Sequence, residues 1–279
     1  MANPIFGRGE GFVKHGSTQT RPQPQGYQQY PQQSQFQQPG FDQQFPQYHQ
    51  QAPQSGAVMT YDDVIAKTGV SLGVVFLVAA ASFFLVPPQL LMPVWIVSAI
   101  ASFVTVLIVA GRRVISPVAL GIYAIFEGVF IGAISSYFEF MWPGIVVNAV
   151  LATFITAAAT LAVMKFGNIR VGHKFRQGVT IATIAFAGVV LVNFVLALLG
   201  VNTGLREIGP GAGWLAIGVS LIAIVLAVFN LVMDFDSVRR GVEARVPATE
   251  SWRAALGITV TMVWLYVEIL RILSYLRND

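Results

Sequence analysis

The chain has 279 residues, of which 55% are hydrophobic and only 11% are charged. Because so few charged residues cannot cover the surface of a water-soluble protein of this length, the composition indicates an integral membrane protein. The formal net charge of +4 is modest, and its distribution fits a topology signal better than a nucleic-acid-binding surface. The sequence contains no cysteine, which excludes disulfides, thiolate metal sites and cysteine nucleophiles.

The first 57 residues are polar and contain almost no aliphatic runs. Between Gln19 and Gln54 the segment consists mainly of Gln and Pro, with interspersed Tyr and Phe. Such a segment has too little apolar surface to offset the entropy that ordering would cost, so we predict that residues 1–57 form a disordered cytoplasmic tail. The tail either binds partners through its aromatic residues or is a solvated extension without a specific role.

Seven stretches within residues 58–279 are long and apolar enough to cross a bilayer as helices. A transmembrane helix needs roughly 20 apolar residues, because the hydrocarbon layer is about 30 Å thick and each helical residue rises about 1.5 Å. The predicted spans are Gly69–Val86, Leu91–Ala110, Pro117–Phe138, Gly144–Met164, Gly178–Leu199, Gly213–Met233 and Ala255–Leu276. The predicted fold class is therefore all-α, a polytopic membrane domain behind a disordered tail.

Lys and Arg residues occupy every alternate connection between these spans. They are Lys67 before the first span, Arg112 and Arg113 after the second, Lys165, Arg170, Lys174 and Arg176 after the fourth, and Arg239, Arg240, Arg245 and Arg253 after the sixth. Because cytoplasmic loops retain Lys and Arg, this pattern predicts a cytoplasmic N-terminus and a C-terminus on the opposite side. We expect a multi-pass protein of the plasma or inner membrane.

Ionisable residues inside the spans are the candidates for function, because each is costly in hydrocarbon and usually faces a cavity or a partner. Glu127 lies near the middle of the third span and has no cation within one helical turn. Asp234 and Asp236 lie at the end of the sixth span, where they either carry function or mark the water boundary. Glu268 and Arg271 lie within the seventh span, three residues apart, so they share a helix face and can neutralise one another.

A set of carboxylates without a nucleophile, a thiol or a histidine favours cation or proton chemistry over catalysis. Ca²⁺ prefers several oxygen ligands, and two carboxylates held close together cannot both ionise freely. The sequence has neither a phosphate-binding glycine loop with its lysine nor a His-Glu-x-x-His zinc helix. We therefore expect no enzymatic activity and no cofactor other than Ca²⁺ as a permeant ion.

Four segments carry a family resemblance through their order and spacing, namely Ala124–Ile134, Gly144–Thr153, Met233–Asp236 and Trp264–Leu273. Together they resemble the Bax inhibitor/YccA-like membrane proteins, particularly a bacterial subgroup with a long polar N-terminal tail. The resemblance covers roughly Met59 to Asp279. It implies six helices around a hydrophobic central seventh and, as in some members of the family, a pH-sensitive Ca²⁺ leak.

In those members an acid at the end of the sixth helix pairs with an acid in the seventh and gates the pore through protonation. The matching residues here are Asp234 and Glu268, which would also be the ligands of a Ca²⁺ ion. The interval between them is about two helical turns longer than in the family, an excess of about 10 Å along a helix. If the following loop absorbs this excess, the pair forms. If the seventh helix is extended, Glu268 lies deeper and faces Glu127 instead.

The family resemblance also supports an alternative without transport. Other members are linked to the regulation of a membrane-anchored protease or to stress protection, through contacts and not through ion flux. In that case the Gln-rich tail and the basic loops would bind other membrane proteins, while the buried acids would contribute only to folding. The lipid bilayer is the expected surrounding in both cases.

Overall fold

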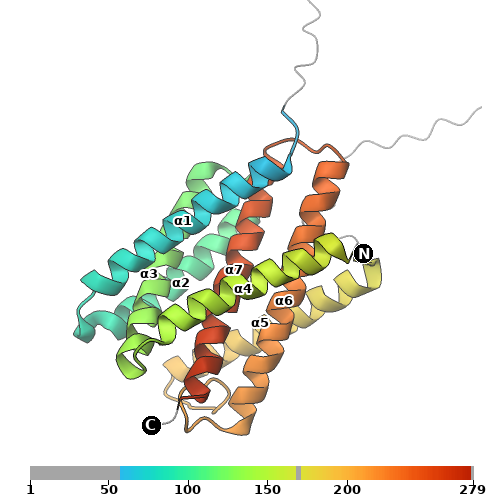
Figure 1. Ribbon diagram of the computed structural model, residues 1–279. Helices are drawn as coiled ribbons and strands as arrows, with labels where there is room; N and C mark the ends of the chain where they lie inside the picture. Colours follow the sequence, from blue (N-terminus) through green and yellow to red (C-terminus); the bar gives the residue numbers. More distant parts are fainter. Residues whose placement is uncertain (1–56, 168–170, 278–279) are drawn as a thin grey trace, which may run out of the picture. The chain divides into compact units, whose positions relative to one another are not determined.

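Seven long helices form the membrane domain (Figure 1). The structure is a computed structural model, and it describes residues 57–167 and 171–277. The elements are α1 (Tyr61–Leu85), the short 3₁₀ turn η1 (Pro88–Leu90), α2 (Leu91–Ala110), α3 (Pro117–Met141), α4 (Ile145–Phe166), α5 (His173–Leu198), α6 (Trp214–Glu243) and α7 (Glu250–Tyr275). Each of the seven helices is long and apolar enough to cross a membrane. The predicted all-α fold with seven spans is confirmed.

The helix bounds differ most from the prediction at α1 and α6. α1 begins at Tyr61 because the Thr60 hydroxyl caps its first turn, accepting a hydrogen bond from the Asp63 N–H at 3.2 Å. α6 continues past the predicted end at Met233 and finishes at Glu243. Charged residues end an apolar stretch, but they do not end a helix, so both helices extend beyond their apolar parts.

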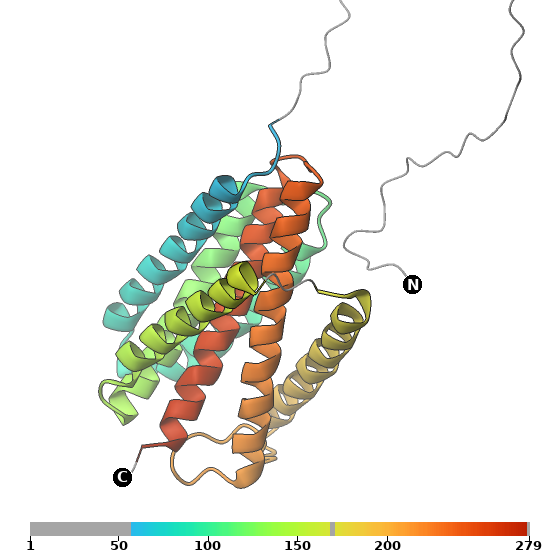
Figure 2. The same cartoon turned by 45° about the vertical axis from the view of Figure 1, so that its right-hand side comes forward.

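α7 is the central helix of the domain, as the family resemblance implies. Fifteen of its residues are buried, whereas α5 has a single buried residue, Val179. α1, α3, α4 and α6 pack directly against α7, and the Phe186 ring of α5 stacks on Trp264 of α7 at 5.8 Å. α2 packs mainly on α3 and α5 mainly on α6. Figure 2 shows α7 (red) between α6 and the helices of the N-terminal half.

α1 and α3 approach each other closely at two glycines of α3. Gly128 and Gly132 are four residues apart, so they lie on one face of the helix. A Cβ atom at either position would collide with α1, at the backbone oxygens of Val75 and Ala79 respectively. Small residues at this spacing allow close helix packing in membranes. This packing holds α3, which carries Glu127, firmly against α1.

The first described residues, 57–59, attach the chain to the loop between α6 and α7. Val58 forms an antiparallel bridge with Pro247, and the Met59 N–H donates to the Val246 carbonyl at 2.8 Å. The Met59 side chain is buried among residues of α1, α6 and α7. The predicted tail lies outside the described residues, apart from its last residue.

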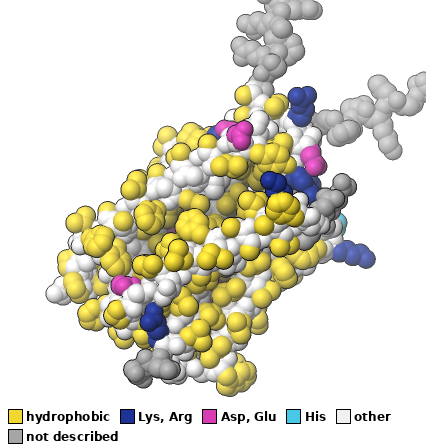
Figure 3. Space-filling view, viewed as in Figure 1, with side chains coloured by type: hydrophobic (Ala, Val, Ile, Leu, Met, Phe, Trp, Pro, Cys, Tyr) yellow, Lys and Arg dark blue, Asp and Glu magenta, His cyan; other side chains and the backbone are white. Residues whose placement is uncertain are grey.

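The two ends of the bundle differ in charge. α1, α3, α5 and α7 begin at the end that we call the basic end, which carries most of the Lys and Arg residues. The end where these helices finish, the opposite end, carries the connection from α5 to α6 and few charges. Figure 3 shows hydrophobic surface between the charged groups of the two ends. That the basic end is cytoplasmic stays a prediction from loop charge.

Candidate functional site

Asp234 lies on α6, where this helix contacts α7. Its Oδ2 accepts a hydrogen bond from the Thr261 hydroxyl at 2.7 Å. Gly257, about one turn earlier on α7, faces the same carboxyl group and leaves room for it, since a Cβ atom there would lie 3.2 Å from Oδ1. Arg176 lies near enough for its charge to act on Asp234, but its guanidinium group binds Asp236. Within the described ranges no Lys or Arg forms an ion pair with Asp234.

Glu127 is buried on α3, with 7% of its surface exposed. The Ser102 hydroxyl of α2 donates a hydrogen bond to Oε2, and Tyr123, one turn earlier on α3, lies close to the carboxyl group. In the part of the chain that the structure describes, Glu127 has no ion-pair partner. Like Asp234, it is therefore a buried acid whose bonded side-chain partners are hydroxyl groups.

Asp234 and Glu127 lie at about the same depth in the bundle, Asp234 next to α7 and Glu127 next to α2. Gly257 and Thr261, the two residues of α7 next to Asp234, lie on either side of Thr259 in the sequence. Tyr123 packs in a cluster with Leu256 of α7, and Glu127 lies one turn further from the basic end than Tyr123. Because α3 and α7 both run away from the basic end, this turn brings Glu127 about level with Thr259.

Hydroxyl groups complete a polar layer at this depth. Ser71 of α1 and Thr259 of α7 are both buried, and their hydroxyl oxygens form a hydrogen bond of 2.6 Å. They lie at about the same depth as the two acids and the hydroxyl groups bonded to them. We call this set the central polar layer; its members are Asp234, Glu127, Ser71, Ser102, Thr259 and Thr261.

Glu268 lies outside the central polar layer, near the opposite end of α7. It follows the first residue of the helix, Glu250, by 18 positions, which is about 27 Å of helix. Arg206 binds both of its carboxylate oxygens, with Nη2 to Oε1 at 2.6 Å and Nη1 to Oε2 at 3.1 Å. The predicted partner Arg271 is also present, with Nε 3.8 Å from Oε2. Glu268 thus contacts arginines, and the predicted alternative contact with Glu127 is not formed.

Asp234 and Glu268 are held by different partners. The loop between α6 and α7, residues 244–249, is short, so the long interval between the two acids lies within the helices. Thr261, which bonds Asp234, precedes Glu268 by two helical turns, about 10 Å along α7. Of the two arrangements considered from the sequence, the extended seventh helix is the one observed.

The described ranges contain no group of three or more His, Cys, Asp or Glu side chains that could hold a metal ion. The two residues predicted to share a Ca²⁺ ion, Asp234 and Glu268, are separated along α7. A cation at Asp234 would therefore have the Thr261 hydroxyl oxygen, and not Glu268, as a neighbouring ligand. This arrangement fits passing contacts with a mobile ion better than tight binding.

Asp236, at the basic end of α6, is surrounded by arginines. Its side chain is 1% exposed and forms ion pairs with Arg176 at 3.0 Å, Arg239 at 2.6 Å and Arg240 at 3.1 Å. Arg176 comes from the first turn of α5, so the cluster ties the start of α5 to the end of α6. An acid already bound by three cations is poorly suited to attract another, so its surroundings favour a structural role.

The loop between α5 and α6, residues 199–213, folds over the end of α7. Besides the Arg206 side chain, its backbone makes contacts there. Arg271 Nη1 donates to the Arg206 carbonyl oxygen at 2.7 Å, and the Gly209 N–H donates to the Ser274 hydroxyl oxygen at 3.1 Å. The loop is therefore held by side chains of the central helix.

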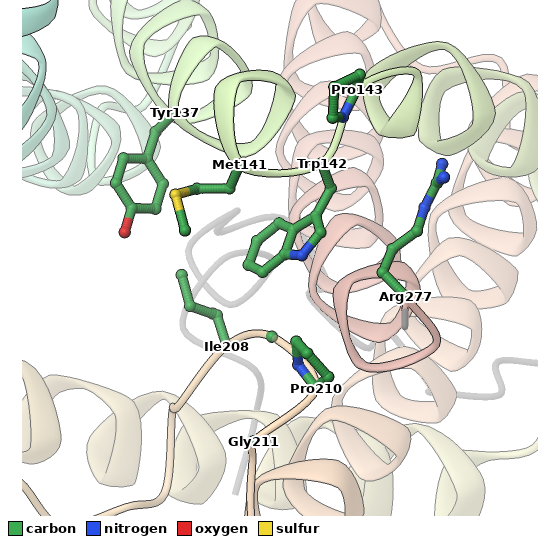
Figure 4. Close-up of a pocket in the computed structure, with 9 residues that line it drawn as sticks. Tyr137, Met141, Trp142, Pro143, Ile208, Pro210, Gly211 and Arg277 are labelled. Atoms are coloured by element: carbon green, nitrogen blue, oxygen red, sulfur yellow. The ribbon is translucent and has the colours of Figure 1, made fainter. Parts of the chain in front are cut away.

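A cavity of about 560 Å³ lies beside this loop at the opposite end (Figure 4). The turn from α3 to α4, with Trp142, forms one wall, and the α5–α6 loop, with Ile208 and Pro210, forms another. The loop rests on Trp142 at Gly209, where φ is +87° and a Cβ atom would collide with the indole ring. Among the described residues, Arg277 is the only cationic one that lines the cavity.

A family model described as Bax inhibitor 1 like matches residues 3–278. The chain belongs to the Bax inhibitor 1-like family. A search of curated proteins gave no match. The family membership confirms the resemblance found in the four sequence segments, while its YccA-like and bacterial details stay predictions.

The sequence analysis of this Bax inhibitor 1-like chain missed Arg206 as a site residue. Arg206 is the one Lys or Arg residue in the sequence between the fifth and sixth predicted spans. That rarity was itself a signal, because an arginine in an otherwise apolar connection can serve as the partner of a buried acid. The hydroxyl partners Thr261 and Ser102 were missed as well, since Ser and Thr are common in membrane helices.

Proposed function

We propose that this Bax inhibitor 1-like protein is a passive cation pathway, with Ca²⁺ as the favoured ion and Asp234 and Glu127 as its proton-sensitive groups. The central polar layer is the observation that supports this proposal. It places two acids, neither of them ion-paired within the described residues, inside an otherwise apolar bundle. Ionisable groups in such positions usually mark ion or proton pathways.

Proton sensitivity follows from the partners of these two acids. A carboxyl group bonded only to hydroxyl groups can gain or lose a proton without breaking an ion pair. The ionised form attracts a cation and the protonated form does not, while the nearby hydroxyl oxygens supply ligands that hard cations prefer. We therefore expect flux to fall as the pH is lowered. The proposal assigns no catalytic step to the protein.

Ca²⁺ entry into proteoliposomes tests this function. Asp234→Asn and Glu127→Gln nearly preserve side-chain shape but remove the charge, so each is expected to reduce flux at high pH and to weaken its dependence on pH. Asp62→Asn is the matched control, because Asp62 is an exposed acid in the first turn of α1. It should behave as the unsubstituted protein does.

Equal flux and an equal pH response in all four proteins, at equal incorporation, would remove both acids from the mechanism. The same result would favour the alternative of a non-transporting protein that regulates a membrane-anchored protease or another membrane protein. A pulldown of partners with the intact chain would then be the next measurement.

A further inference from the structure

We propose that Arg206 closes the opposite end of this pathway, because its α5–α6 loop is a lid that the Arg206–Glu268 pair holds on the end of α7. The inference deepens the proposed function and rests on it for the existence of a pathway. It assigns a positioning role to Arg206. Glu268 anchors the loop through Arg206 and does not act as the partner of Asp234.

The geometry of the pair is that of a specific closure. Arg206 binds Glu268 through two nitrogen–oxygen contacts, and the side chains are 14% and 1% exposed. A bidentate contact of this kind fixes orientation as well as distance. Because Arg206 is the only loop side chain that binds Glu268, the position of the loop depends directly on this contact.

A second arginine makes the closure reversible. Arg271 lies on the same face of α7 as Glu268, and its Nε is buried without a hydrogen-bond partner among the described residues. When Arg206 withdraws, Arg271 can take over the carboxylate with a small change of side-chain conformation. Release of the loop therefore does not leave Glu268 as an unpaired buried charge, which would be strongly unfavourable.

The remaining contacts of the loop include backbone hydrogen bonds to side chains of α7 and the packing of Ile208 and Gly209. The Tyr275 hydroxyl donates to the Glu207 carbonyl at 3.0 Å, and the Gly209 N–H donates to Ser274. Gly204 and Gly209 both have positive φ, a conformation that glycine adopts without strain and that is common where loops bend. The cavity beside the loop, about 560 Å³, gives it space into which to move.

Cysteine accessibility tests the lid, because the native chain contains no cysteine. Ser274→Cys places a reporter beneath the loop, at a side chain with 0% exposure. Ser220→Cys is a second reporter, since Ser220 is equally buried and bonds Tyr275 at 3.1 Å. The control reporter is Ser135→Cys, which is buried on α3 and bonds Tyr266 away from the loop. The proteins are placed in nanodiscs, where an impermeant maleimide reaches both ends.

In the native background we expect slow labelling of all three reporters. Arg206→Gln should speed labelling of the two reporters near the loop about tenfold, because labelling follows the population of the open form when opening is fast. The charge exchange Arg206→Glu with Glu268→Arg should restore slow labelling. Unchanged labelling in Arg206→Gln, or equal acceleration at Ser135→Cys, would overturn the lid, the latter by showing a general loosening of the bundle.

Ca²⁺ flux measured on the same variants separates this inference from the proposed function. Faster labelling in Arg206→Gln, with no flux in any protein, would retain the lid and reject the pathway. Greater flux without faster labelling would retain the pathway and reject the lid. Faster labelling together with greater flux, both reversed by the charge exchange, is the result that we expect.

Discussion

Two of the buried acids of the bundle are bound by arginines, and two are bonded to hydroxyl groups. Asp236 at the basic end and Glu268 at the opposite end are each 1% exposed, and each is bound by at least two arginines. Asp234 and Glu127 in the central polar layer are bonded to hydroxyl groups instead. The same chemical group is therefore paired with arginines in two places and, among the described residues, has no bonded cation in the other two.

The positions of the arginines in the chain explain which acids are paired. Arginines in loops and helix ends reach the surface of the membrane and can turn inward to bind an acid near the end of a helix. Asp234 lies only two positions before Asp236, about 3 Å along the helix, but on another side of α6, where it faces α7 and not the arginines. We therefore expect the paired acids to stabilise the bundle and the acids of the central polar layer to contribute less to its stability. The variants below test this comparison through thermal unfolding in detergent micelles, followed by tryptophan fluorescence.

The largest loss of stability is expected for Glu268→Gln. The substitution leaves Arg206 and Arg271 buried with no carboxylate, and breaking a buried pair in this way costs about 3 kcal/mol or more. The charge exchange Arg206→Glu with Glu268→Arg should recover part of the loss. If Glu268→Gln were as stable as the native protein, the ion pair would contribute nothing to the fold. The expected difference between arginine-paired and hydroxyl-bonded acids would then not hold for Glu268.

Asp236→Asn should have a smaller effect, about 1 to 2 kcal/mol. Its three arginine partners are more exposed than those of Glu268, with side chains of Arg176, Arg239 and Arg240 at 20%, 24% and 44%, so water can solvate them when the carboxylate is lost. Glu243→Gln is the control, because Glu243 lies on the same helix end and is 66% exposed. A cost for Asp236→Asn equal to that of the control would show that the cluster adds no stability.

The existence and order of the helices could be predicted from the sequence, because a membrane span needs only sufficient length and apolar composition. The relative register of α6 and α7 could not. The interval from Asp234 to Glu268 allowed either a long loop or longer helices, and only packing decides between these. In the structure α6 runs to Glu243 and the following loop is short, which places Glu268 far from Asp234.

The candidate site was predictable only in part, for a related reason. Buried acids can be recognised one at a time, since each is an exception within an apolar span. Their partners lie far away in the chain: Ser102 precedes Glu127 by 25 positions, and Arg206 precedes Glu268 by 62. Loop residues such as Arg206 follow no periodic pattern, so nothing in the sequence indicates which helix they contact.

Asp234→Asn is expected to change stability by less than about 1 kcal/mol. The asparagine side-chain oxygen can still accept the hydrogen bond from Thr261, and no bonded cation loses its partner. Thr261→Val provides the contrast, because it removes the donor and leaves the carboxyl group without its hydrogen bond, which should cost about 1 to 3 kcal/mol. A loss in Asp234→Asn as large as in Glu268→Gln would mean that a cation such as Arg176 depends on Asp234 after all.

The smallest effect is expected for Glu127→Gln, within about 0.5 kcal/mol of the native protein. The Ser102 hydroxyl bonds this side chain, and a hydroxyl can rotate to donate to the amide oxygen or to accept from the amide nitrogen. Among the described residues, Glu127 has no arginine that acts on it as Arg176 acts on Asp234, so less electrostatic energy depends on its charge. Glu127→Leu is the contrasting variant, because it removes the acceptor and leaves the buried Ser102 hydroxyl without its partner. If Glu127→Gln lost as much stability as Glu127→Leu, the negative charge itself would be holding the helices together, and Glu127 would belong with the structural acids of the two ends.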